Sequence, residues 1–378
     1  MHLTRIRIRH FRNIESIDWD PAPGLNLIWG DNGQGKTNVL EAVHMALTGR
    51  SFRTGREGEC LPWNREEDPA APTLLEADLK TARGGRRLRL LLGRRWKQAF
   101  TDGQWVARLA DLWTCGALVT FTPQAVGLFK GPPAERRRFL DMVLSRLSRP
   151  YLDRLQRYHQ ALRRLNAILK SGSSPAGVRR QAEAYYAQLA EAGAAVMLDR
   201  ARRLGHSGPA IAGRFNRVGG GGTLELIYDH SLGELPLDLA DPALEPGALA
   251  REYLERLHAQ HEDNQRLGAC ALGVHRDDFS ARLDGHDLRR FGSQGQHRLA
   301  ALTLKLEAAD WIEHDIGDTP ILLLDDFGSE LDPDRREAVL RGLRGAMQVI
   351  ITATRPADLG DAVPFDRSML ISGGRFQK

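Results

Sequence analysis

The 378-residue sequence predicts an α/β fold that is interrupted by a mainly helical second domain. Near the start, a short apolar run at residues 25–29 leads into a glycine-rich loop and then a helix. Near the end, residues 321–324 are apolar at every position, which is typical of a strand buried on both faces of a parallel sheet. Between these regions, apolar residues recur at helical spacing. We therefore expect both ends to build one mixed sheet and the middle to be an insertion.

The elements of the two ends follow from local patterns. The run at 25–29 ends at Gly30, and helical spacing begins at about Thr37 and stops at Gly49. A βαβ unit is predicted at the far end, where a helix at 333–343 separates two apolar runs. The remaining predictions are strands at residues 3–9, 73–79, 86–92, within 93–116, 278–283 and 348–352, and a helix at 295–313.

The insertion predicts an antiparallel helical arm. Two long helices, from Leu140 to Leu169 and from about Val178 to Leu204, flank a polar turn with Gly and Pro. The glycine run at 219–222 predicts a linker, followed by a strand at 223–228 and a helix at 248–267. The predicted domains are residues 1–125 and 270–378 for the two parts of the head, and 126–269 for the insertion.

Composition and charge limit the classes of protein to which this chain can belong. The chain is 42% hydrophobic and 27% charged, as ordinary globular proteins are, and no apolar run is long enough for a bilayer. Three cysteines without a CxxC pair indicate a reduced compartment and disfavour a cysteine zinc site. Residues 130–217 hold 18 basic and 6 acidic residues, a net charge of +12, against −7 for the rest of the chain. Such asymmetry favours a polyanionic partner.

The strongest chemical motif is a phosphate loop at residues 30–37, of the form G-x-x-x-x-G-K-[ST]. Its glycines let backbone N–H groups point at phosphate oxygens, Lys36 adds a point charge, and Thr37 offers a hydroxyl to Mg²⁺. An incidental glycine-rich turn is the alternative. The strand before the motif and the helix after it favour nucleotide binding. The predicted nucleotide-binding residues of this loop are Gly30, Asp31, Asn32, Gly33, Gln34, Gly35, Lys36 and Thr37.

A pair of carboxylates supplies the expected partner motif. Asp325 and Asp326 follow the apolar run at 321–324, so they should lie at the carboxyl edge of the sheet, where open α/β folds bind ligands. Asp325 is predicted to hold Mg²⁺ together with Thr37. Asp326 is predicted to act as general base or to orient the attacking water. Two acidic residues in a turn are the alternative.

The loop Ser293-Gln294-Gly295-Gln296 stands at the start of a predicted helix. A Ser-x-Gly-x sequence in this place is the signature loop of ABC-type ATPases, which binds the γ-phosphate held by the other subunit. A hydroxyl, glycine N–H groups and a helix N-terminus all suit that anion. The alternative is an ordinary serine N-cap. Ser329 and Asp332 follow the carboxylate pair, where such heads place a loop that crosses the dimer interface.

Taken together, these motifs resemble the bacterial RecF family of recombination proteins along nearly the whole chain. The segments that carry the resemblance are Phe11–Asn13, the phosphate loop with Asn38, Gly49–Thr54, Phe121–Gln124, Lys130–Asp141, Gly273–Asp278, the signature loop and Leu323–Asp332. Family members are similar to the heads of structural-maintenance-of-chromosomes and Rad50 proteins, without their long coiled coils. The resemblance places Asn38 among the nucleotide-binding candidates. Arg12 follows a predicted strand and is a further candidate, although it is equally compatible with a surface arginine.

The resemblance implies an ATPase head that uses ATP and Mg²⁺ and dimerises with ATP. It implies binding to gapped DNA or to junctions of single- and double-stranded DNA, with weak, DNA-stimulated hydrolysis. The implied partners are RecR and RecO, and RecA indirectly, in recombinational repair, replication restart and the SOS response. The implied location is the cytoplasm near the nucleoid, with no membrane partner.

Other interpretations remain open at several residues. The basic segment is either a solvated helix face or a DNA-phosphate surface, with Arg136, Arg137 and Arg138 as the candidates nearest the head. Thr354 follows the last strand, where transporters carry a switch histidine, and is a candidate to replace it.

Two rival functions are a structural chromosome-organising head and a small-molecule P-loop enzyme. The first fits poorly because an arm of about 35 residues per helix spans only ~50 Å. A small-molecule P-loop enzyme also fits poorly, because the signature loop would have no function in it.

Overall fold

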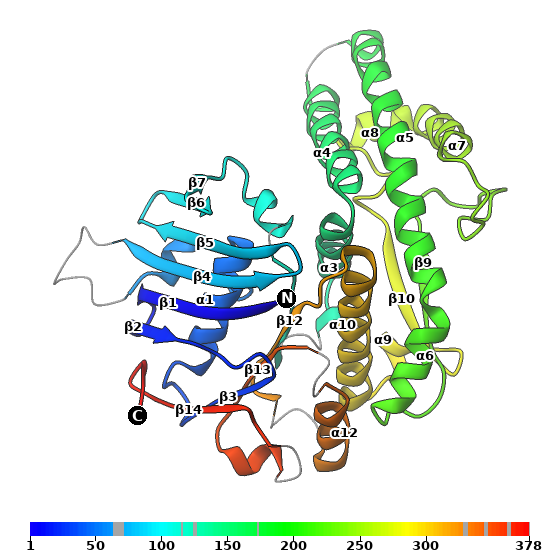
Figure 1. Ribbon diagram of the computed structural model, residues 1–378. Coiled ribbons are helices and arrows are strands. Elements are labelled where there is room, and N and C mark those ends of the chain that lie inside the picture. Colours follow the sequence, from blue (N-terminus) through cyan, green and yellow to red (C-terminus); the bar gives the residue numbers. More distant parts are fainter. Residues whose placement is uncertain are drawn as a thin grey trace. The chain divides into compact units, whose positions relative to one another are not determined.

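The computed structural model describes residues 1–62, 72–114, 116–123, 127–171, 174–327, 332–343, 347–360 and 364–377. The chain divides into two compact units (Figure 1). The first comprises Met1–Ala125, Arg217–Gly220 and Arg298–Lys378, and the second Val126–Asn216 and Gly221–His297. The predicted return to the head at residue 270 is therefore too early. Residues 278–283 stay in the second unit because they pair with its strand at 224–229.

The first unit contains a largely parallel sheet. Strands β14, β3, β13, β12 and β8 run parallel, and β15 pairs antiparallel with β14 at one edge. Helix α12 (Pro333–Leu343) connects β12 to β13, as the apolar pattern predicted. The predicted α/β class is thus confirmed. In sheet order the strands are β15 (Arg375–Phe376), β14 (Arg367–Ser372), β3 (Leu25–Trp29), β13 (Val349–Ala353), β12 (Ile321–Leu324) and β8 (Leu118–Phe121).

A second, antiparallel sheet completes this unit. Helix α1 (Lys36–Thr48) packs against strands of both sheets, so it is buried almost all round rather than amphipathic. Gly49 ends the helix in a left-handed conformation, φ 71°. In sheet order the strands are β2 (Ile14–Trp19), β1 (His2–Phe11), β4 (Thr73–Thr81), β5 (Gly84–Leu92), β6 (Lys97–Thr101) and β7 (Gln104–Trp105), and a short 3₁₀ helix follows at Leu109–Thr114.

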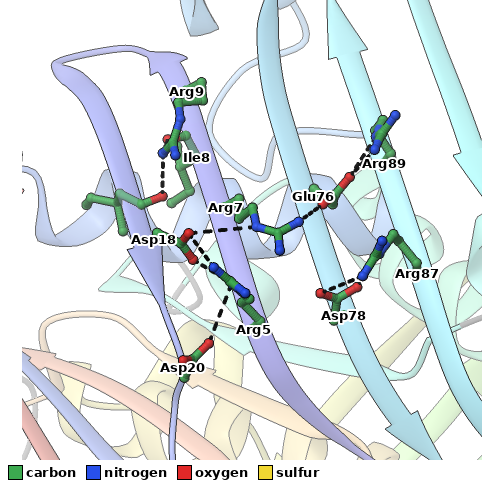
Figure 2. Close-up of polar contacts among 11 residues, drawn as sticks. Arg5, Arg7, Ile8, Arg9, Asp18, Asp20, Glu76, Asp78, Arg87 and Arg89 are labelled. Atoms are coloured by element: carbon green, nitrogen blue, oxygen red, sulfur yellow. Dashed lines mark hydrogen bonds and ion pairs between the residues drawn. The ribbon is translucent and has the colours of Figure 1, made fainter.

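The face of this sheet away from α1 carries a ladder of ion pairs (Figure 2). Arg7 on β1 contacts Asp18 on β2 and Glu76 on β4, and Glu76 also accepts from Arg89 on β5 at 2.7 Å. A second row joins Asp78 to Arg87 at 2.6 Å. The more exposed pairs, such as Arg87 with Asp78, contribute at most ~1 kcal/mol each, whereas the Glu76 side chain is buried. Their alternation fixes the strand register instead, because a one-residue slip would bury every charge.

The second unit is built around a helical hairpin. The predicted arm is present, but its first helix is two: α3 (Pro133–Leu147) and α4 (Arg149–Leu169), divided at Ser148. The Ser148 side chain accepts from the Tyr151 N–H and so caps α4. The predicted helix at 248–267 is likewise two helices that meet at Gln260. The other helices are α2 (Gly127–Lys130), α5 (Pro175–His206), α6 (Gly208–Arg217), α7 (Pro246–Ala259), α8 (His261–Leu267) and α9 (Leu288–Phe291).

A small sheet lies beside these helices in the order β11 (His286–Asp287), β10 (Asp278–Leu283), β9 (Leu224–Asp229). Helix α10 (Gln294–Ile316) begins in the second unit and continues into the first. Among the described residues, no helix is both long and apolar enough to cross a membrane.

The segment 273–278 ties the second unit together through buried polar contacts. His275 contacts the Tyr158 hydroxyl at 2.7 Å and the Cys270 carbonyl at 3.0 Å. The Asp277 carboxylate accepts from Tyr228 and from the Ser231 N–H. A Cβ at Gly273 would lie 1.7 Å from the Tyr253 hydroxyl, so only glycine fits there. These residues have a structural role.

Contacts with the same segment show that the predicted DNA-binding triplet, residues 136–138, is partly wrong. Arg136 is only 3% exposed; it makes two hydrogen bonds of 2.7 Å to Asp278 and also donates to the carbonyls of Leu128 and Gly131. Arg137 donates to the Asp277 carbonyl at 2.6 Å. Arg138 is the exposed member of the triplet. Arg136 therefore cannot reach a DNA phosphate, because its donors are already bound inside the protein.

Replacing Arg136 with Ala should destabilise the protein by about 2–4 kcal/mol, because it leaves Asp278 and two carbonyls without their donor. Arg138→Ala removes the same charge from the surface and should change stability by less than about 0.5 kcal/mol. Urea unfolding followed by circular dichroism measures both. Equal effects from the two variants would contradict the structural role of Arg136.

Candidate functional site

The phosphate loop connects β3 to α1 at the carboxyl edge of the parallel sheet. A Cβ at Gly30 would meet the Ile371 carbonyl oxygen at 2.3 Å, and Gly35 has a φ of 111°, so both positions require glycine. The Lys36 ammonium donates to the carbonyls of Gly30 at 2.6 Å and Asp31 at 3.0 Å. Burial lowers the pKa of Lys36, although Asp326 and Asp325 oppose the shift.

Three parallel strands bring their polar ends together beside this loop. The Asp325 carboxylate after β12 accepts from Thr37 on α1 at 2.9 Å and from Thr352 on β13 at 2.8 Å. The Asp326 N–H donates to the Thr352 hydroxyl at 2.8 Å, and Asp326 has a φ of 49°. Burial raises the pKa of Asp325, while the two hydroxyl donors partly offset this. The predicted meeting of Thr37 with Asp325 is thus present, across 288 positions of sequence.

These groups line a cavity of about 440 Å³, large enough for a phosphorylated ligand. Cationic and anionic side chains both face it, which suits a phosphate group with its metal ion. The lining residues are Arg12, Asn13, Asn32, Gly33, Gly35, Lys36, Thr37, Asn38, Arg53, Pro123, Asp325, Asp326 and Thr352.

Thr37 and Asp325 fit a divalent cation of the Mg²⁺ type. Their hydroxyl and carboxylate oxygens are hard donors that already converge to 2.9 Å. The buried Asp325 carboxylate lacks water to stabilise its charge, so a cation would favour its ionised form.

Glu41 on α1 is a site residue that the sequence pattern did not reveal. Its fully buried carboxylate accepts two hydrogen bonds from Arg12, at 2.5 and 2.8 Å, and lies 3.4 Å from Arg53. One carboxylate therefore holds two guanidinium groups that both line the cavity. Because two positive charges meet one negative charge, a surplus positive charge remains for an anion. The available signal was the one acidic residue of α1, which stands between Leu40 and Ala42.

The predicted nucleotide-binding residues do not all face the cavity. Gln34 accepts from the Gly373 N–H at 2.6 Å and so ties the loop to the turn after β14. Asn38 donates to Asn13 at 2.7 Å and accepts from Arg53 at 2.8 Å, which closes one wall. Thr352, which the sequence did not single out, lines the cavity in place of Thr354. Thr354 contributes its carbonyl to the Gly30 N–H at 3.2 Å.

The signature loop lies in the second unit and is exposed at Ser293 and Gln294. The Ser293 hydroxyl accepts from the Gln296 N–H at 3.2 Å, and the Gln296 side chain accepts from the Ser293 N–H at 2.8 Å. This reciprocal capping fixes the start of α10. Asp332 is exposed and accepts from the Arg335 N–H at 3.0 Å. The predicted interface residue Ser329 lies outside the described residues.

Comparisons with known proteins agree with this geometry. Residues 5–71 match a family model described as an AAA domain. The chain is 37% identical over 361 residues to the DNA replication and repair protein RecF of Symbiobacterium thermophilum, which covers 95% of this chain and 93% of the relative. It is 36% identical over 358 residues to the protein of the same name from Geobacter sulfurreducens, covering 94% and 93%.

Solved structures give the same result. The structure of the recombination mediator protein RecF with ATPrS in the RecFOR pathway matches with a TM-score of 0.87 and 28% identity, over 100% of this chain and 98% of that one. An Smc head bound to the C-terminal winged-helix domain of ScpA matches with a TM-score of 0.57 at 15% identity, over 100% and 96%, which shows a shared fold.

Replacing Asp325 with Asn should stabilise the protein when neither nucleotide nor metal is present. The folded-state pKa of Asp325 is raised, so ionising it costs stability as the pH rises above the unfolded value of about 3.9. The gain should therefore be largest at pH 8 and shrink toward pH 4. Urea unfolding at several pH values measures it, with the exposed Asp20→Asn as control. A variant that is less stable than the parent at pH 8 would contradict the strained carboxylate.

Proposed function

The chain belongs to the RecF family of DNA replication and repair proteins, and on that premise we propose that it is an ATP-dependent recombination mediator. The observation that carries this proposal is the convergence of Thr37, Asp325 and Thr352 on the phosphate-loop cavity. If the loop were only a structural glycine-rich turn, it would not require a buried carboxylate beside it that accepts hydrogen bonds from two threonine hydroxyls. The close relatives and the ATPrS-containing structure support the same proposal.

In the proposed site, the N–H groups of the loop and the start of α1 bind the phosphates of ATP. Lys36 exchanges its two carbonyl contacts for the β- and γ-phosphates. Thr37 and Asp325 would hold Mg²⁺, Asp325 through water, and the ion neutralises phosphate charge when bound. Arg12 and Arg53 add positive charge at the wall. Asp326 orients the attacking water or accepts its proton, in a slow, DNA-stimulated hydrolysis that acts as a switch.

The signature loop supplies the other half of each composite site in an ATP-dependent homodimer. Ser293 and Gln294 are exposed and the loop is held rigid by its own capping, so Ser293 can meet the γ-phosphate bound by a second copy. The exposed carboxylate of Asp332 and, from the resemblance, Ser329 belong to the same interface.

The proposed biological role follows from the family. The protein closes on gapped DNA or on junctions of single- and double-stranded DNA in the cytoplasm, and with RecO and RecR it helps RecA to load. The description of the similar solved structures as part of the RecFOR pathway supports these partners. Recombinational repair, replication restart and SOS induction would depend on it.

A second candidate is a structural chromosome-organising head. The fold likeness to Smc heads favours it. Helix α5, however, has 32 residues and spans only ~48 Å, far less than a tether between distant DNA sites requires. The mediator role is therefore the better-supported proposal.

Three variants should separate the steps of this cycle. Lys36→Met should weaken ATP binding by about tenfold or more, because it removes the charge on the phosphates. Ser293→Arg should bind ATP as the parent does but remain monomeric. Asp326→Asn should bind ATP and accumulate as a dimer, because it keeps the shape of the site and lacks the carboxylate that directs water.

ATP binding is measured by fluorescent-nucleotide titration and dimerisation by light scattering. ADP serves as the control ligand and should not drive dimerisation. Dimerisation of Ser293→Arg with ATP would rule out the composite site, and equal loss of ATP binding in Lys36→Met and Asp326→Asn would rule out the assigned roles.

A further inference from the structure

The far end of the helical hairpin α4–α5 carries a continuous positive charge. Residues 154–182 are 29 consecutive residues that contain seven basic residues and no Asp or Glu. They cover α4 from its sixth residue to its end and the first eight residues of α5. No alternation of sign reduces this charge, in contrast to the ladder on the antiparallel sheet of the first unit.

Several basic residues of the second unit are already paired, including Arg154 of this stretch. Arg136 binds Asp278, Arg149 binds Asp153, and Arg154 binds Asp199. The buried Arg200 binds Asp141. These four arginines therefore serve the fold.

The remaining basic residues toward the tip are different. Six of them are exposed, and within the described part of the chain none forms a side-chain hydrogen bond or ion pair. They are Arg157, Arg163, Arg164, Lys170, Arg179 and Arg180. Glu183 on α5 pairs with His258. Helix α8, which packs against α4, carries Glu262 and Asp263, and Asp263 pairs with Arg266.

Helix geometry gathers these charges in a small region. Arg163 and Arg164 lie within the last two turns of α4, and Arg179 and Arg180 within the first two turns of α5, so all four are within roughly 10 Å of the helix ends. Helices α4 and α5 pack side by side (Figure 1). The apolar residues between them, such as Leu165 and Ala182, are buried in the hairpin, so the charges face outward.

We propose that the exposed side chains of these six residues, called the hairpin tip below, contact the phosphate backbone of nucleic acid. The proposal rests on the DNA-binding function proposed above and names the surface that carries it, in place of Arg136. Unpaired arginines are the groups whose charge a polyanion neutralises with release of counterions. No aromatic side chain is exposed among them to stack on a base, so contacts to the backbone and little sequence preference are expected.

The alternative polyanion is an anionic lipid surface. Surface-bound helices insert large apolar side chains into the bilayer. Among the described residues, none of the exposed large apolar side chains lies on α4 or α5. The tip therefore fits a phosphate backbone better than a membrane.

The test compares two triple variants of the full-length protein that lower the net charge equally. The tip variant carries Arg163→Ala, Arg164→Ala and Arg180→Ala. The control variant carries Arg83→Ala, Arg94→Ala and Arg95→Ala, all exposed residues of the first unit. Binding to a fluorescent duplex with a single-stranded overhang is measured by anisotropy with a non-hydrolysable ATP analogue, from about 50 to about 200 mM salt.

The tip variant should bind DNA roughly tenfold more weakly at low salt. The slope of log K against log salt should fall by up to about 2.7, that is about 0.9 for each of three lost contacts. ATP-analogue affinity and thermal stability should match the parent, and the control variant should keep the parent slope.

An unchanged slope in the tip variant, or an equal loss in the control, would overturn the assigned surface while leaving the proposed function intact. If the parent protein bound no DNA, both would fail. Binding of the parent and the tip variant to vesicles of phosphatidylglycerol and phosphatidylcholine tests the lipid alternative. If the tip variant lost vesicle binding but kept DNA binding, the tip would be assigned to lipid and the proposal would be overturned.

Discussion

The shared hydrogen bonds of Asp325 are the constraint on which the site depends. A single carboxylate oxygen accepts from Thr37 and Thr352, and so joins the ends of β3–α1, β12 and β13. This contact requires the three strands to be parallel and in register, because only then do their carboxyl ends meet. The carboxylate is buried to make it, which raises its pKa, and a stability cost of this kind is typical of functional sites.

Other buried ionic contacts in each unit fix the positions of their side chains, and breaking one by removing a single partner is destabilising. Glu41 holds Arg12 and Arg53 at the cavity wall, as Asp278 holds Arg136 and Asp141 holds Arg200 in the second unit. Replacing such pairs by apolar residues is often neutral for stability, so their value lies in fixing geometry. The same side-chain type thus does three tasks in this chain: it lines an anion site, it holds the second unit together, and at the hairpin tip it remains available to a partner.

Local motifs let the sequence predict the phosphate loop, α1, β12 and the αβ order of the ends. The sequence did not predict Thr352 and Glu41 as site residues, because their roles depend on contacts with residues far away in sequence, which no local pattern encodes. Arg136 was misassigned for the same reason, since its partner Asp278 is 142 positions away. The break at Ser148 could have been found, because Ser-Arg-Pro is a recognisable helix start that the apolar spacing concealed. The boundary predicted at residue 270 was wrong because it depends on the pairing of β9 with β10, which joins residues about 50 positions apart.

The central claim, that Thr37 and Asp325 act as one metal-binding unit, is tested most directly by a double-mutant cycle. Affinity for a non-hydrolysable ATP analogue is measured with and without Mg²⁺ for the parent, Thr37→Val, Asp325→Asn and the double variant. With Mg²⁺, the double variant should bind about as weakly as the weaker single variant, with a coupling energy of roughly 1–3 kcal/mol, and without Mg²⁺ the coupling should vanish. Additive losses that do not depend on Mg²⁺ would contradict the account.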